Sequence, residues 1–134
     1  MKRALAQKVW ERAGHCCEYC QMPQELDDIP FEIDHIDSKK HGGQTELGNL
    51  GLSCFWCNSF KGSNIADRDA QTRKLTPLFN PRRHKWRKHF RWRGAVLLGL
   101  TAIGRVTIAI LKINDPFRVE LRESLIEEGS FPPS

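Results

Sequence analysis

The sequence predicts an α+β fold, in which a unit of two strands and one helix is closed by a four-cysteine zinc site. Three observations predict this unit. Four cysteines form two C-x-x-C pairs, the segment between the pairs has the pattern strand, loop, strand, and a helical pattern follows the second pair. An N-terminal helix before the unit, and a β-hairpin plus two helices after it, complete the expected fold.

Length and composition set the bounds of this prediction. With 134 residues, the chain fits a single domain over 1–134 whose small core would gain from a metal staple. Within it we expect a core unit over 16–66 and a basic accessory tail over 67–134 that packs on the core unit. No apolar run is long enough for a membrane span, and the N-terminus lacks the features of a signal peptide. We therefore expect a soluble, cytoplasmic protein with no membrane partner.

The zinc ligands are expected among five cysteines. An odd number does not make a complete disulfide set, whereas two C-x-x-C pairs are typical of tetrahedral thiolate coordination. A redox C-x-x-C motif is the alternative, but a redox site needs one pair near a βαβ pattern, and none is visible. Cys16 is left over as a small packing residue, although Cys16 or His15 could replace Cys17. The expected ligands are Cys17, Cys20, Cys54 and Cys57.

Hydrophobic periodicity gives the order of the elements. We expect a helix over 2–13, strands over 31–35 and 50–53, a helix over 55–66, and two short strands around Gly94. Two helices follow, the first with Thr101 as its N-cap, and the second with Asp115 as its N-cap, Pro116 at N1 and Gly129 as its stop. The segment 72–81 is expected to be a connector.

A second metal site is predicted where the first strand ends. Asp34 and His35 are adjacent, so both can reach one site only where the backbone bends at a strand end. Oxygen atoms of Asp34 and Asn58 would suit a hard divalent ion such as magnesium. Because imidazole titrates near neutral pH, His35 is the side chain suited to take a proton from water. Each residue also has a purely structural explanation, as a turn or helix cap or as a half-buried histidine.

Two further residues are placed around this predicted site. Asn49 opens the second strand and could hold the loop after His35 through amide hydrogen bonds, or could serve only a turn. Lys61 lies three residues after Asn58, on the same helical face, and could contact a substrate phosphate.

A basic block predicts contact with nucleic acid. Between Arg73 and Arg93 there are nine Lys or Arg residues, two His and no acid. A solvated surface is the simpler interpretation, but aromatic residues alternate with the cations, as in many nucleic-acid-binding segments. The alternation of Phe90 and Trp92 is that of a buried strand face, so these two are assigned to the core. The cations assigned to phosphate contact, besides Lys61, are Arg82, Arg83, Lys85, Arg87 and Lys88.

The motifs "IDHI", "GG", "NL" and "C-x-x-C-N-x-x-K", in this order, resemble the HNH endonucleases of the ββα-metal class, in the H-N-N variant. The resemblance covers about residues 16–66. It implies His35 as general base, Asp34 and Asn58 as ligands of a catalytic magnesium or manganese ion, Asn49 as orienter of the His35 loop, and the four cysteines as a structural zinc site. Many relatives carry His where Asn58 stands, which leaves the preferred metal open.

The sequence therefore predicts a metal-dependent endonuclease that hydrolyses DNA by nicking or by double-strand cleavage. The alternative is a non-catalytic, zinc-stapled nucleic-acid-binding module. RNA is a weaker candidate than DNA as the substrate.

Overall fold

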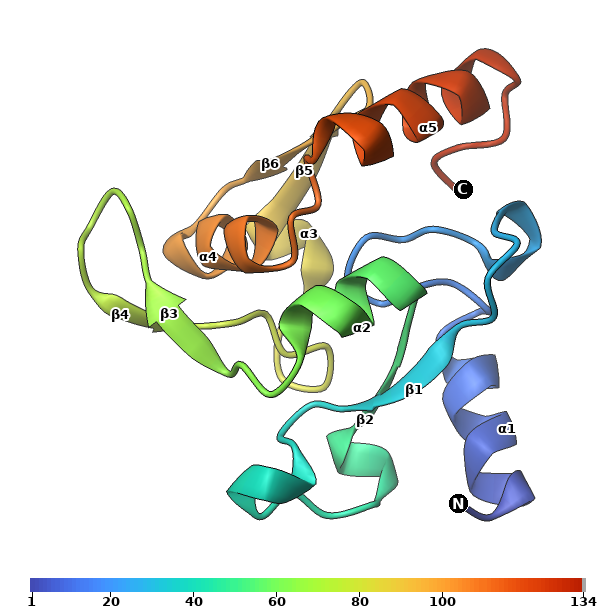
Figure 1. Ribbon diagram of the computed structural model, residues 1–134, viewed down its shortest axis with the longest axis vertical. Helices are drawn as coiled ribbons and strands as arrows, with labels where there is room; N and C mark the ends of the chain where they lie inside the picture. Colours follow the sequence, from blue (N-terminus) through green and yellow to red (C-terminus); the bar gives the residue numbers. More distant parts are fainter. Residues whose placement is uncertain (134) are drawn as a thin grey trace.

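The computed structural model describes residues 1–133 and has an α+β architecture of five α-helices and three two-stranded antiparallel sheets. Figure 1 shows the N-terminal half of the chain below and the C-terminal half above, with helix α2 between them. This confirms the predicted fold class. Within residues 1–133, no helix is both long and apolar enough to cross a bilayer.

The N-terminal half contains the predicted unit of two strands and one helix. Helix α1 (Arg3–Arg12) precedes strands β1 (Glu32–His35) and β2 (Leu50–Ser53) and helix α2 (Phe55–Lys61). The strands pair from Glu32 opposite Ser53 to His35 opposite Leu50. The helix expected over 55–66 is shorter than predicted, because Gly62 has φ +51° and leaves the helical conformation.

The C-terminal half contains two hairpins and three helices. Their order is β3 (Ala66–Arg68), β4 (Leu75–Pro77), α3 (Trp86–His89), β5 (Phe90–Arg93), β6 (Val96–Gly99), α4 (Ala102–Ile110) and α5 (Pro116–Glu127). The hairpin around Gly94 is confirmed. The expectation of a connector over 72–81 is wrong in part, because Leu75–Pro77 pairs with Ala66–Arg68.

The ends of the last two helices agree with their predicted signals. The Thr101 hydroxyl accepts a hydrogen bond from the Gly104 amide at 3.1 Å, as an N-cap does. Asp115 is the N-cap residue of α5, as predicted, although its side chain makes no capping hydrogen bond, and Pro116 begins α5 at N1, where a backbone N–H would have no helical partner. Gly129, with φ +78°, follows the end of α5.

The two halves share one hydrophobic core and are also joined by indole hydrogen bonds. Phe90 is 2% exposed, and Trp92 is half-buried against the same core, as predicted. The Trp86 indole donates to the Tyr19 carbonyl at 2.8 Å, and the Trp92 indole donates to the Gln21 side chain at 2.9 Å. The aromatic residues of the basic block therefore hold the tail against the segment around the first cysteine pair.

Candidate metal and active sites in the N-terminal half

The four predicted cysteines lie together beneath the surface. Their Sγ atoms all lie within 4.8 Å of one another, and all four side chains are buried. The first pair belongs to the turn after α1, and the second pair lies at the start of α2, where Cys54 is the N-cap and its Sγ accepts from the Cys57 amide at 3.4 Å. Among residues 1–133, this is the one group of three or more Cys, His, Asp or Glu residues that could hold a metal.

The alternative ligands of the first pair are not in this cluster. Cys16 is half-buried, and its thiol contacts the Gly14 carbonyl at 3.5 Å. His15 is exposed. The structure therefore selects Cys17 from the three candidates at this position.

Two buried arginines show that the cluster suits a metal ion. Arg118 is 6% exposed and its Nη2 lies 3.1 Å from the Cys57 Sγ and 3.9 Å from the Cys54 Sγ. Arg122 is 1% exposed and donates to the carbonyls of Ala95 and Ile113 rather than to a carboxylate. Four thiolates around one zinc ion carry a formal charge of about −2. Two buried guanidinium groups offset that charge, so the donor set and its surroundings fit zinc.

The cysteine cluster also affects the pKa of Arg118. Burial alone would lower the pKa of its guanidinium, but the charges of Cys57, Cys20 and Cys54 more than offset this effect and hold the pKa above its usual value. Sequence reasoning missed Arg118, because it lies 61 residues after Cys57 in a helix whose pattern indicated nothing beyond packing.

Replacing Arg118 tests its role at the cysteines. We expect Arg118→Met to weaken zinc binding by roughly 10- to 100-fold, the usual cost of removing a hydrogen-bond partner of a metal ligand. Competition with a colorimetric zinc chelator measures this affinity. Arg105→Met is the matched control, because Arg105 pairs with Asp69 and not with a cysteine. If both variants bind zinc as the parent protein does, Arg118 serves only to pack α5.

The loop after β1 is closed by the side chain of Asn49. Its amide accepts from the Asp37 N–H and donates to the carbonyls of Asp37 and Gln44, each at 2.9 Å. Gly43 packs so closely that a Cβ there would lie 1.7 Å from the Asp37 oxygen. The loop therefore needs glycine at this position, which explains the second residue of the "GG" motif.

His35 stands at the last position of β1. Its side chain is half-buried, and Nε2 lies 2.8 Å from the hydroxyl of Thr45. Asn49 holds both sides of this loop, so it also restrains the segment that carries Thr45. The ring is thus oriented by a loop whose own shape is fixed by hydrogen bonds.

The Asp34 carboxylate has different neighbours from His35. It is 5% exposed, accepts from the Tyr19 hydroxyl at 2.8 Å, and pairs with the Lys61 ammonium at 3.2 Å. Burial raises its pKa above the ordinary value, and the Lys61 charge opposes that shift. The adjacent side chains of Asp34 and His35 point to different sides of the strand, as alternation requires. The structure does not bring them to one site.

Lys61 and Asn58 also have partners within the protein. Lys61 is 2% exposed, and besides Asp34 it donates to the carbonyls of His35 and Ile36 at 3.3 and 3.1 Å. In this arrangement its ammonium is not available to a phosphate, contrary to its assignment as a nucleic-acid contact. The Asn58 side chain donates to the carboxylate of Glu32, a residue that the sequence reasoning did not single out.

The ligands expected for a magnesium or manganese ion do not form an open site here. Glu32, Asp34 and Asn58 offer hard oxygen atoms where β1 faces α2. However, Tyr19 and Lys61 already occupy the carboxylate of Asp34, and the nearby ammonium would repel a cation. As the side chains stand, Asp34 and Asn58 are not a pair of free ligands. The catalytic metal ion stays a prediction.

Residues 17–64 match the family model of the HNH endonucleases. They form an HNH domain. The match contains the four cysteines, β1, the loop held by Asn49, β2 and α2, which is the region on which the resemblance rested. Comparisons with curated proteins and with solved structures give no match.

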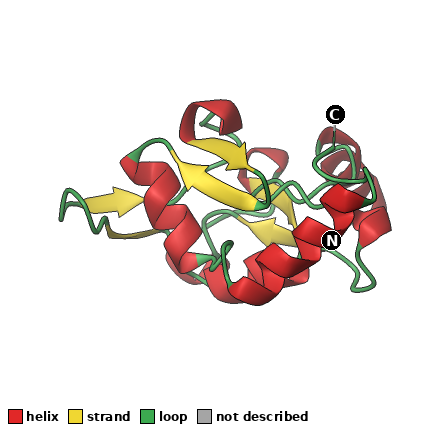
Figure 2. Cartoon of the chain, turned by 90° about the horizontal axis from the view of Figure 1, so that it is seen from above, coloured by secondary structure: helices red, strands yellow, loops and turns green. Residues whose placement is uncertain are grey.

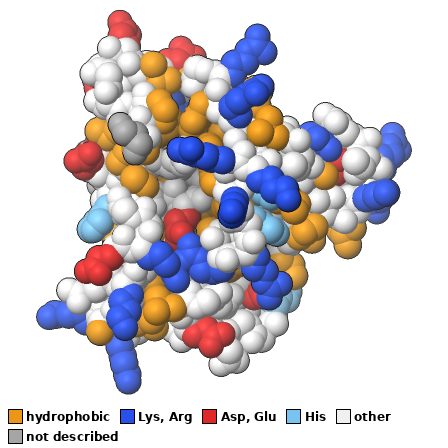
Figure 3. All heavy atoms as spheres, turned by 180° about the vertical axis from the view of Figure 1, so that it is seen from behind, with side chains coloured by type: hydrophobic (Ala, Val, Ile, Leu, Met, Phe, Trp, Pro, Cys, Tyr) orange, Lys and Arg blue, Asp and Glu red, His pale blue; other side chains and the backbone are white. Residues whose placement is uncertain are grey.

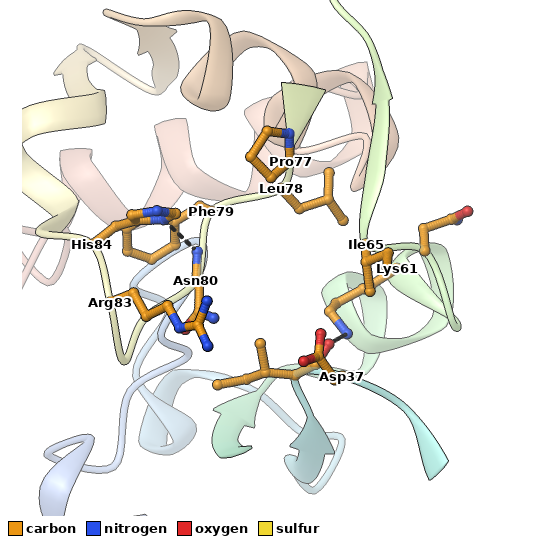
Figure 4. A pocket seen from close by; sticks show the side chains of 11 residues that line it. Asp37, Lys61, Ile65, Pro77, Leu78, Phe79, Asn80, Arg83 and His84 are labelled. Atoms are coloured by element: carbon orange, nitrogen blue, oxygen red, sulfur yellow. Dashed lines mark hydrogen bonds between the residues drawn. The ribbon is translucent and has the colours of Figure 1, made fainter. Parts of the chain in front are cut away.

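A cavity of about 250 Å³ lies between the HNH domain and the tail, next to the end of β1. Figure 4 shows Asp37 and Lys61 on one side and Asn80, Arg83 and His84 on the other. The backbone N–H of Asn80 donates a hydrogen bond to Nδ1 of His84 at 2.9 Å. Nδ1 is therefore the acceptor, and the proton of the neutral ring lies on Nε2. Arg83 is exposed at this cavity.

The other cations assigned to nucleic-acid contact differ in solvent exposure and in whether they already have a partner within the protein. Arg82 is half-buried and forms an ion pair with Glu18, which itself accepts from the Leu52 amide at 2.9 Å. Arg82 therefore ties the tail to β2 of the HNH domain rather than facing solvent. The exposed members of the set are Arg83, Lys85, Arg87 and Lys88. Figure 3 shows Lys and Arg side chains spread over one face of the molecule, from the end near α1 to the projecting part at the opposite side.

Proposed function

We propose that this protein is an endonuclease that hydrolyses phosphodiester bonds of DNA. The observation that carries the proposal is the position of His35 in the HNH domain. Its imidazole is half-exposed at the end of β1 and oriented by Thr45, in a loop that Asn49 closes. An oriented imidazole at a surface site can act as a general base near neutral pH.

The geometry favours one division of roles between the two ring nitrogens. If Nε2–H donates to the Thr45 hydroxyl oxygen, Nδ1 carries the lone pair. Nδ1 then takes a proton from a water molecule whose oxygen forms a bond to phosphorus. The bond from phosphorus to the leaving sugar oxygen breaks, and that oxygen gains a proton from solvent. Asn49 acts as a positioning residue, because it touches the loop and not the reacting atoms.

A divalent metal ion, magnesium or manganese, is proposed as the cofactor of this reaction. A plasmid-cleavage assay with the purified protein tests this proposal. Supercoiled plasmid DNA is incubated with the zinc-loaded protein in magnesium, in manganese, or without added divalent ion. The expected result is conversion to nicked or linear DNA only when a divalent ion is present. No conversion under any condition would contradict the endonuclease proposal.

The alternative is a non-catalytic nucleic-acid-binding module that uses the same zinc site and basic surface. The saturation of Asp34 by Tyr19 and Lys61 favours it, because a ligand of a catalytic metal should be open. The two functions differ in the plasmid assay, since the module would retard DNA in a gel without cutting it.

The exposed cations of the basic block give a prediction about binding. We expect the triple variant Lys85→Gln, Arg87→Gln, Lys88→Gln to flatten the dependence of log affinity on log salt by about 2.7, at about 0.9 for each lost phosphate contact. Affinity should fall alike for all duplex sequences. Fluorescence anisotropy across a salt series measures this slope.

Arg82→Gln is the matched control for that variant. It removes the ion pair with Glu18, so we expect a lower melting temperature but an unchanged salt slope. An unchanged slope in the triple variant would mean that these residues form only a solvated surface.

A further inference from the structure

The β3–β4 hairpin projects from the body of the molecule. Figure 1 shows it extending away from α2 and α4, and Figure 2 shows the same projection from above. Its strands pair Arg68 with Leu75 and Asp67 with Thr76. Each strand has three residues, which span about 10 Å at about 3.3 Å each.

The hairpin is rigid although it projects. Asp69 is 1% exposed, accepts from the Arg105 guanidinium through both of its oxygens at 3.1 Å, and accepts from the Thr72 amide at 2.9 Å. The guanidinium of Arg105 lowers the pKa of Asp69 below its ordinary value. Helix α4 packs against both strands. A fixed tip loses little conformational freedom when it binds a partner.

The tip combines exposed cations with an exposed apolar side chain. Arg68, Arg73 and Lys74 are exposed, and Leu75 is 74% exposed, the most open of the large hydrophobic side chains in residues 1–133. Arg68 and Leu75 are directly opposite in the register, so they share one face of the hairpin. The carboxylate of Asp69 is buried in its pairing with Arg105, which leaves Asp67 as the one exposed acid in the segment 66–77.

Both ends of the hairpin are attached beside the candidate active site. β3 follows α2, whose Lys61 donates to the His35 carbonyl. β4 leads into Leu78–Asn80, which line the same cavity as Ile36 and Asp37. A duplex whose phosphate lies at His35 would therefore pass the base of the hairpin.

We propose that the β3–β4 hairpin enters the major groove of duplex DNA next to the cleaved phosphate. This inference rests on the proposed function for its substrate. The major groove, about 12 Å wide and about 8.5 Å deep, admits a two-stranded ribbon. The hairpin is long enough to reach its floor, where Leu75 contacts a thymine methyl group while Arg73 and Lys74 neutralise phosphates at the groove edges.

The test separates binding from cleavage by using the His35→Ala protein throughout. In this background, Arg73→Gln with Lys74→Gln should flatten the salt slope by about 1.8. Leu75→Ser should weaken duplex binding by about fivefold without changing the slope, because it removes apolar contact and no charge. Leu100→Ser is the matched control, since Leu100 is an exposed leucine outside the hairpin, at 43%. It should bind as the parent does.

Methylation interference identifies the groove. Methylation of guanine N7, which lies in the major groove, should block binding at positions beside the cleavage site, and the Leu75→Ser protein should lose this interference. If Leu75→Ser and Leu100→Ser bind equally well and the interference pattern is unchanged, the hairpin does not enter the groove. A parent protein that binds duplex with this pattern yet never cuts plasmid would overturn the endonuclease proposal and leave the hairpin inference standing.

Discussion

His35→Ala is expected to reduce plasmid cleavage by about 10²- to 10⁴-fold, the usual contribution of a positioned general base. DNA affinity and zinc content should stay near those of the parent, because a base acts in the transition state rather than in binding. Single-turnover cleavage at saturating DNA, with anisotropy and elemental analysis on the same preparation, measures all three quantities.

His41→Ala is the control that this loop offers. His41 is exposed and lies on the same loop, in the short turn Lys39–His41, but within residues 1–133 no side-chain hydrogen bond joins it to Thr45 or Asn49. We expect it to cleave as the parent does. If His41→Ala loses activity and His35→Ala keeps it, the general base lies in the glycine loop, and the role given to Thr45 is wrong.

The local parts of the fold could be predicted because their signals are local. The two C-x-x-C pairs, the alternation in "FEIDH" and the N-cap at Thr101 each depend on residues a few positions apart. The β3–β4 hairpin was not predicted, because it has no such local signal. Its strands have three residues each, without apolar alternation, and its turn is fixed by Asp69 through Arg105, which lies 36 residues away.

The sequence predicted which residues lie at the candidate site, but it did not predict their hydrogen-bond and ion-pair partners. Asp34, His35, Asn49 and Asn58 all lie in the HNH domain, as the motif indicated. Their partners come from distant segments, however. Tyr19 reaches Asp34 across 15 residues, and Lys61 across 27. Whether a lysine faces solvent or a buried carboxylate depends on this packing, which the i, i+3 spacing from Asn58 does not reveal.

Loss of the metal that we propose for the four-cysteine cluster, a zinc ion, is expected to have the largest effect on stability. Structural zinc contributes roughly 10–16 kcal/mol in small zinc domains, which is as large as the whole stability of a typical domain. We expect one zinc ion per chain that survives dialysis, and we expect Cys54→Ser to leave the protein largely unfolded. Elemental analysis and circular dichroism with and without chelator measure these two results.

Cys16→Ser is the matched control, because Cys16 lies outside the cluster of four sulfur atoms. It should keep its zinc and its melting temperature. Zinc-free parent protein that stays folded would contradict the structural role.

The buried arginines make the expected consequence of zinc loss more specific. Without the metal, the thiols bind protons and lose their negative charge, so Arg118 and Arg122 would remain as buried cations with no charged partner. Helix α5, which carries both, should then leave the core before the rest of the chain unfolds.

Hydrogen exchange during chelator titration tests this order. Amides of Pro116–Glu127 should lose protection at lower chelator concentration than those of β5 and β6. Simultaneous loss in all three elements would show that zinc supports the core as a whole, and that Arg118 does not link α5 to the metal in particular.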